Sequence, residues 1–258
     1  MIDRRYRSVR HAVGTRVTRH GVPASAVRAG ERPPLRTVAM SDGAMTEVSC
    51  CVYDLHMPGE AMHQKGADGA RRAKKWLDST TRVQASWTNE DAVHASRLEF
   101  KWPSGDKQPF SFDVGGILSG GEYEGHFFVA ECKKYEADSD QGVHFDDFVA
   151  KCYLTRRDNS RVADHFMWIT WAPFRVKTWK NLCSADSILT GLKVERNLKR
   201  ALGVENVADA DGQIDLDLAQ EVADRMWLLV LSEKQEKLVI TPEHRALIVA
   251  DQIRNGER

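Results

Sequence analysis

The sequence predicts an α/β protein in which helices and strands alternate through a core, followed by a helical extension. Three patterns predict this class. Residues 66–78 repeat small and apolar side chains at helical spacing, and four short apolar or alternating runs lie between residues 81 and 135. A helical pattern at 143–156 then precedes a largely apolar run at 165–171. Strands on both sides of a helix are typical of a sheet covered by helices.

The first elements are a helix and several strands. A mixed pattern at 47–55 predicts one strand, and the helix at 66–78 follows, with an apolar stripe among arginines and lysines. The later strands are predicted at 81–87, 95–102, 109–118 and 125–135. A turn at 103–106 and a loop with two glycines separate the last three of them.

The second half begins with the helix at 143–156 and the strand at 165–171, which Pro173 ends. Beyond it, helices are predicted at 174–183, 187–201, 216–232 and 242–254. Thr241 before Pro242 is a strong start signal for the last helix. We therefore divide the chain into a segment 1–39, a core 40–173 and a helical extension 174–258.

Composition is that of an ordinary globular protein, with 42% hydrophobic and 29% charged residues. No apolar run approaches the roughly 18 residues of a membrane span, so no membrane association is expected. The five cysteines are odd in number and contain no CxxC pair. They indicate neither a disulfide framework nor a zinc site, and the expected location is the cytoplasm.

The formal net charge of zero conceals an asymmetry. Residues 1–39 contain nine arginines, no lysine and two acids, and lack a periodic apolar pattern, so they are predicted to be disordered. Two interpretations are open. The segment is a basic arm that contacts phosphates, or it is a start-site artefact with Met40 as the true first residue.

Two acids and an amine form the most informative constellation. Asp113 lies in one apolar run, and Glu131, Cys132 and Lys133 lie at the end of the next. The spacing leaves room for a strand, a loop and a returning strand, so the carboxylates can meet. Because side chains alternate along a strand, Glu131 and Lys133 point the same way and Cys132 points into the core. Such a cluster can hold a divalent metal and activate water.

These motifs, in this order of elements, resemble the PD-(D/E)xK nuclease superfamily over about residues 63–173. The superfamily includes restriction endonucleases, Mrr-type and Holliday junction resolvase-like enzymes and phage-defence nucleases. The resemblance implies a restriction-endonuclease-like αβββαβ core, with a mixed sheet flanked by helices. It also implies a Mg²⁺-dependent (or Mn²⁺-dependent) endonuclease, a phosphodiester hydrolase acting on DNA in antiviral defence.

The resemblance also implies roles for individual residues. Asp113 and Glu131 are the expected metal ligands, with the backbone carbonyl of Cys132 as a third. Lys133 is expected to orient the attacking water or to stabilise phosphate charge. The family often carries a glutamate on its first helix, and here Asp68 is the nearest acid. Gln141, at the start of the second helix, is expected to face the phosphate.

Three alternatives remain open. The three charged residues can form an ordinary surface salt bridge, which would contribute little stability. The chain can also be a catalytically inactive DNA-binding module of the same fold that positions a partner. It can further be an RNase or an exonuclease. Expected partners are DNA, a second copy of the chain, since one site cuts one strand at a time, and a protein of a defence system.

Overall fold

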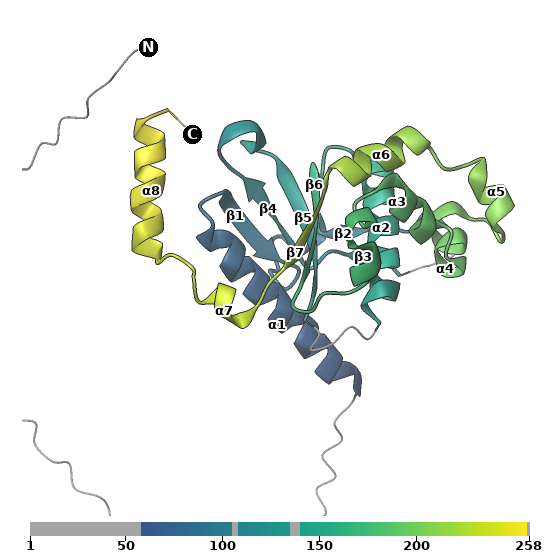
Figure 1. Cartoon of the computed structure of the whole chain (residues 1–258), viewed down its shortest axis with the longest axis horizontal. Coiled ribbons are helices and arrows are strands. Elements are labelled where there is room, and N and C mark those ends of the chain that lie inside the picture. Colours follow the sequence, from purple (N-terminus) through teal and green to yellow (C-terminus); the bar gives the residue numbers. More distant parts are fainter. Residues whose placement is uncertain (1–57, 105–107, 135–139, 257–258) are drawn as a thin grey trace, which may run out of the picture. The chain divides into compact units, whose positions relative to one another are not determined.

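The computed structural model describes residues 58–104, 108–134 and 140–256, with side chains from residue 66 onward. The predictions for residues 1–39 and for a strand at 47–55 lie outside these ranges. Within them the chain forms a mixed five-stranded sheet with helices on both faces (Figure 1). The α/β class and the mixed, helix-flanked sheet are therefore confirmed.

The sheet has the strand order β1-β4-β5-β6-β7. Strands β1 (Val83–Thr88), β4 (Val114–Leu118) and β5 (Phe127–Lys133) are antiparallel neighbours. Strands β6 (His165–Thr170) and β7 (Met226–Val230) continue the sheet in parallel with β5. Helix α2 (Gln141–Asp158) connects β5 to β6, since a parallel pair needs a crossover connection.

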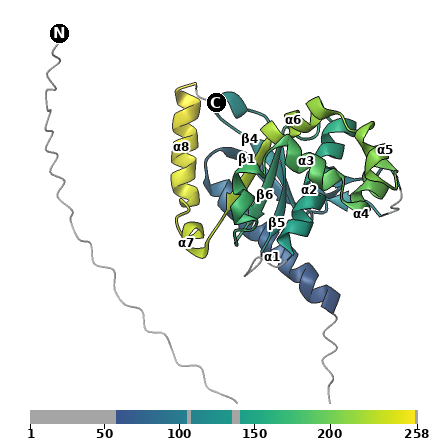
Figure 2. The ribbon, with the colours of Figure 1, turned by 45° about the vertical axis from the view of Figure 1, so that its right-hand side comes forward.

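Each face of the sheet is covered by helices (Figure 2), and each has its own apolar core. Helix α1 (Pro58–Ser79) packs on one face through Ala70, Ala73 and Leu77. Helices α2 (Gln141–Asp158), α3 (Ala185–Leu192) and α6 (Leu216–Asp224) form the larger core on the other face. The predicted helices at 66–78 and 143–156 are confirmed, and both extend further than predicted.

Strand β5 is buried on both faces, and its side chains alternate between the two cores. Phe128, Ala130 and Cys132 pack toward α1, whereas Val129 belongs to the core beneath α2. By the same alternation Glu131 and Lys133 face α2. The sequence prediction that the Cys132 side chain enters the core is confirmed.

The predicted strands at 95–102 and 109–118 are only partly correct. The first is a 3₁₀ turn, η1 (Ala95–Arg97), followed by the two-residue strand β2 (Glu99–Phe100). The second breaks into β3 (Phe110–Ser111) and β4, with Phe112 and Asp113 between them. In the described part of the chain β3 pairs with β2 in a separate two-stranded ladder, and the aromatic rings of residues 100, 110 and 112 pack together in the core.

The C-terminal region is not a purely helical extension. The predicted helix at 216–232 ends at Asp224, and β7 then joins the central sheet beside β6. Backbone pairing decides this, because Phe166 N–H donates to the Arg225 carbonyl and Leu231 N–H to that of Thr170. Helix α8 (Pro242–Arg254) is confirmed, and the Thr241 hydroxyl caps it by accepting from His244 N–H.

The other short elements of this region are η3 (Val176–Asn181), α4 (Glu195–Asn197), η4 (Leu198–Leu202), α5 (Val207–Asp211) and α7 (Glu233–Glu236). One further short turn, η2 (Gly121–Tyr123), lies in the loop between β4 and β5. The predicted helix at 174–183 is thus a 3₁₀ turn, and the one at 187–201 is divided. Among the described residues, no helix combines the length and apolarity needed to cross a membrane.

Candidate functional site

The two candidate acids lie on adjacent strands at one end of the sheet. Val114 is opposite Ala130 in the β4–β5 ladder, which brings Asp113 alongside Glu131. Asp113 N–H donates to the Ala130 carbonyl at 2.9 Å, and Cys132 N–H donates to Asp113 Oδ2 at 2.7 Å. Asp113 is therefore bound to the backbone of β5 on both sides of Glu131. Its N–H binds Ala130, and its carboxylate binds Cys132.

Glu131 has a lysine on each carboxylate oxygen. Oε1 lies 2.9 Å from Lys133 Nζ, and Oε2 lies 3.1 Å from Lys151 Nζ. Only 8% of the Glu131 side chain is exposed, so this charge depends on its partners for stability. Lys151 comes from α2 and also donates to the Ser111 carbonyl at 3.2 Å, which links β3, β5 and α2 at one point.

The surroundings of Asp113 and Glu131 shift their pKa values in opposite directions. Burial, and then the negative charge of Glu131, raise the pKa of Asp113 to about 7, although Lys133 and the Cys132 N–H oppose this shift. Burial alone would raise the pKa of Glu131, but Lys133 and Lys151 outweigh burial and lower that pKa to about 2. Glu131 is thus ionised at neutral pH, while Asp113 titrates there, as expected for closely spaced carboxylates.

Lys151 is a residue of this cluster that the sequence prediction did not select. Its signal is positional. Phe148 and Thr155, three residues before and four after it, are buried at 0% and 1% exposure, so Lys151 lies on the sheet-facing stripe of α2. A lysine on such a stripe requires an acceptor inside the protein, and a glutamate at the end of a covered strand provides one.

Gln141 is not in this cluster. It is fully buried at the first turn of α2, where its Oε1 accepts from the Thr170 hydroxyl at 2.7 Å. Its Nε2 donates to the Ala172 carbonyl at 3.2 Å. Both ends of the amide therefore bind the end of β6. In this arrangement Gln141 fixes the start of α2 to the end of β6.

Asp68 lies on the α1 side of the sheet and pairs with Lys134. The hydrogen bond from Lys134 lowers the pKa of Asp68. Two consecutive lysines thus bind acids on opposite faces of the sheet. Lys133 binds Glu131, and Lys134 binds Asp68. Across residues 66–104, 108–134 and 140–256, no three histidine, cysteine, aspartate or glutamate side chains group closely enough to hold a metal. The predicted set that added Asp68 to Asp113 and Glu131 is therefore not assembled.

The Cys132 side chain offers no thiolate, because burial raises its pKa well above the ordinary value. Two carboxylates remain, on Asp113 and Glu131. Carboxylate oxygens are the ligands that Mg²⁺ prefers, and one or two of them suffice when water and a substrate phosphate complete the shell. The residues present therefore fit Mg²⁺ or Mn²⁺ as a pair of ligands.

Comparisons with known proteins add little. No family model and no curated protein matches this sequence. Among solved structures, a SAVED/CARF-domain containing receptor, Cap4 of Moraxella osloensis, aligns at 12% identity with a TM-score of 0.30. The alignment covers 74% of this chain, which spans only 40% of that receptor's length. A similarity of this size carries no functional conclusion.

Proposed function

We propose that this chain is a divalent-cation-dependent nuclease that hydrolyses phosphodiester bonds of DNA. One observation supports this best: the carboxylate of Asp113 is fixed to the β5 backbone next to Glu131, whose two oxygens each hold a lysine. Two carboxylates beside a lysine can hold a divalent ion that activates water, with an amine close to the charge of a phosphate.

Asp113 and Glu131 would hold Mg²⁺ or Mn²⁺, with the Cys132 carbonyl as a further ligand by resemblance to the PD-(D/E)xK nucleases. When bound, the ion supplies a more acidic water molecule and neutralises charge on the phosphate. Asp113 must lose its proton to serve as a ligand, and its pKa of about 7 makes this proton available near neutral pH.

The two lysines have different roles. Lys133 is the last residue of β5 and is the amine proposed to orient the attacking water or to contact the phosphate. Lys151 is a positioning residue, since it holds Glu131 Oε2 while bonded to the Ser111 carbonyl. Its side chain is 16% exposed, against 22% for that of Lys133. Lys133 is thus the more accessible of the two.

The order of elements supports the same proposal. The αβββαβ core of restriction-endonuclease-like proteins has the same order of elements as α1, β1, β4, β5, α2 and β6 of this chain. β2 and β3 would then be an insertion between β1 and β4. We propose that the chain acts as an endonuclease in defence against foreign DNA. It would work with a defence partner protein, and as a homodimer where both strands are cut.

A second function is favoured by a specific observation. Asp68 is bound to Lys134 and no third acid joins Asp113 and Glu131 among the described residues. A DNA-binding module of the same fold, without catalysis, would tolerate this arrangement. In such a module Lys133 and Lys151 would simply neutralise Glu131.

One experiment separates these functions. The full-length protein is incubated with circular single-stranded DNA, circular double-stranded DNA and RNA, with Mg²⁺, with Mn²⁺ or with chelator. We expect cation-dependent cleavage of DNA that is lost in Asp113→Asn, Glu131→Gln and Lys133→Met. Glu90→Gln, which alters an exposed pair with Arg71, is the matched control.

Cleavage of linear but not circular DNA would indicate an exonuclease, and cleavage of RNA alone an RNase. Calorimetric titration of Mg²⁺ into the wild type and Asp113→Asn tests the metal site itself. Full activity in all three site variants would overturn the nuclease proposal. DNA binding without any Asp113-dependent cation binding would establish the inactive module.

A further inference from the structure

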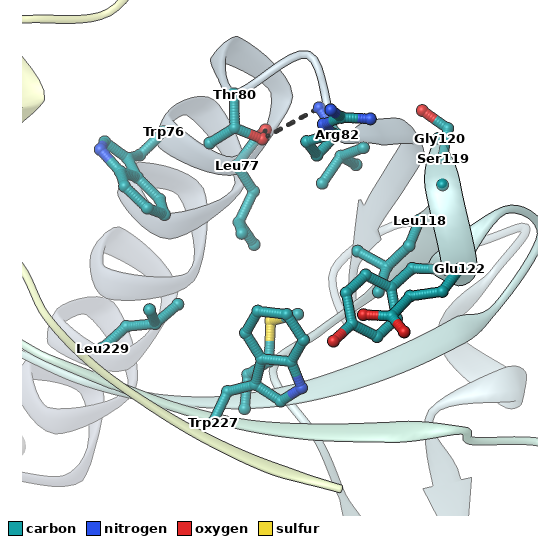
Figure 3. A pocket seen from close by; sticks show the side chains of 14 residues that line it. Trp76, Leu77, Thr80, Arg82, Leu118, Ser119, Gly120, Glu122, Trp227 and Leu229 are labelled. Atoms are coloured by element: carbon teal, nitrogen blue, oxygen red, sulfur yellow. Dashed lines mark hydrogen bonds between the residues drawn. The ribbon is translucent and has the colours of Figure 1, made fainter. Parts of the chain in front are cut away.

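A pocket lies on the α1 face of the sheet, opposite the face on which Glu131 binds Lys133 and Lys151. It is a cavity of about 430 Å³ between the end of α1, strands β1, β4 and β7, and the loop that connects β4 to β5. Figure 3 shows Trp227 projecting into it from β7, with Trp76 at its border on α1. Its volume falls within the range typical of small-ligand pockets. The proposed nuclease site uses none of its residues.

The aromatic wall of this cavity is held in place before any ligand binds. Trp227 Nε1–H donates to His165 Nδ1 at 3.2 Å, so the indole presents only its ring surface to the cavity. The Tyr123 ring meets Trp227 edge to face, with the two centroids 5.4 Å apart. A flat surface already fixed in this way loses little entropy when a flat ligand stacks on it.

Two opposite hydrogen-bonding groups lie at the rim. The Arg82 guanidinium rests against Gly120, with Nη1 at the place where a Cβ of residue 120 would lie. Gly120 has φ of +84°, so the loop turns there and leaves that space for Arg82. Glu122, on the same loop, hydrogen-bonds Tyr123. Arg82 only donates and the Glu122 carboxylate only accepts.

A ligand that matches this pocket is flat, largely uncharged, and carries both acceptors and donors on its edge. Arg82 would attract an anion, but Glu122 would repel it. Glu122 would attract a cation, but Arg82 would repel it. We propose that the cavity binds a nucleobase, which stacks on Trp227 and meets Arg82 and Glu122 with its edge. Guanine is the best match, since it presents O6 and N7 as acceptors and amino hydrogens as donors.

Calorimetric titration of the full-length protein in chelator tests this binding without cleavage, so its result is independent of the nuclease proposal. The ligands are guanosine, adenosine and 7-deazaguanosine, with indole as an apolar control. We expect saturable binding, with guanosine the tightest and 7-deazaguanosine weakened by loss of the N7 acceptor. A short oligodeoxynucleotide with one guanine, and the same strand with an abasic position, distinguish a free nucleoside from a base within a strand.

Trp227→Leu is expected to weaken guanosine binding by about tenfold or more, as for loss of a stacking surface. Because this variant removes a partly buried ring, Arg82→Gln and Glu122→Gln provide tests at exposed positions. Each is expected to reduce the preference for guanosine over adenosine. Arg97→Gln and Glu99→Gln, also exposed but outside the cavity, are the matched controls.

Two results would overturn the assignment. One is the absence of saturable binding by every nucleoside and oligonucleotide. The other is equal binding of guanosine and of indole, unaffected by either rim variant, because that would identify a general apolar site for a peptide side chain.

Discussion

The two faces of the sheet bury polar groups in different ways. On the α2 face, Glu131 remains charged because Lys133 and Lys151 each bind one of its oxygens. On the α1 side, His165 accepts from Trp227 at Nδ1, so its proton lies on Nε2, which is 3.1 Å from His126 Nδ1. The ring nitrogens of Trp227, His165 and His126 therefore bind one another as neutral groups. Charge at the end of a buried strand is suited to binding a metal and a phosphate, whereas neutral rings suit an uncharged ligand.

The strongest way to break the charged cluster is to remove its centre. Glu131→Ala leaves Lys133 and Lys151 without their carboxylate in a mostly buried place. Breaking a buried ion pair in this way typically costs about 3–5 kcal/mol. We expect a loss of this size in the free energy of unfolding, measured by urea denaturation at pH 7. Glu90→Ala, at an exposed pair with Arg71, should cost at most about 1 kcal/mol. Equal losses in the two variants would show that Glu131 is not buried among cations.

The pH dependence of stability sharpens the same comparison. Asp113 has a pKa of about 7 in the folded chain, above the ordinary value of about 4. A raised pKa means that the folded state binds the extra proton. The stability that Asp113 contributes is therefore complete below about pH 4 and is lost as the pH rises to about 7. The slope from this group is at most about 1.4 kcal/mol per pH unit.

Urea denaturation at intervals from pH 4 to pH 7.5 measures this slope, and Asp113→Asn should remove it. Glu131 acts in a separate window, because its lowered pKa makes its contribution disappear only as the pH falls from about 4.5 to about 2. An unchanged slope in Asp113→Asn would mean that the Asp113 carboxyl is ionised throughout.

Much of this arrangement could be predicted from the sequence. The alternation along β5 correctly separates Glu131 and Lys133 from Cys132, because a strand offers only two faces. The hairpin that joins Asp113 to Glu131 follows from two apolar runs with a glycine-containing loop. Local patterns were sufficient where one element or one hairpin determines the geometry.

The rest depends on partners that are distant in sequence. β7 follows α6 without a turn signal, and its apolar run becomes a strand only because β6 presents an open edge. Gln141 faces Thr170 and Ala172, residues that helical spacing alone cannot bring to it. Asp68 lies on the face opposite Glu131 because α1 covers the Cys132 side of β5, a choice that no local pattern reveals.

The neutral network should respond to pH in the opposite direction from Asp113. Burial, and then the neighbouring His126, lower the pKa of His165. The stability that neutral His165 contributes is present above the ordinary histidine pKa of about 6.5 and is lost as the pH falls below it. His165→Leu leaves the Trp227 N–H without its acceptor, which should cost about 1–3 kcal/mol at pH 7.5. Urea denaturation should show a smaller difference from wild type at pH 5, whereas a constant difference would point to lost packing alone.

The smallest effect on stability is expected for Lys134, which follows Lys133 but binds Asp68 on the α1 side of the sheet. Lys134 binds Asp68, and their side chains are 35% and 42% exposed, so Lys134→Met should cost about 0–1 kcal/mol by urea denaturation. DNA cleavage should be unchanged, because Asp68 and Lys134 lie on the α1 side of β5, away from Glu131. Lys133→Met, the adjacent substitution of the same residue type, should abolish cleavage. Loss of cleavage in Lys134→Met at unchanged stability would place Asp68 and Lys134 in the proposed nuclease site and remove the distinction between the two faces.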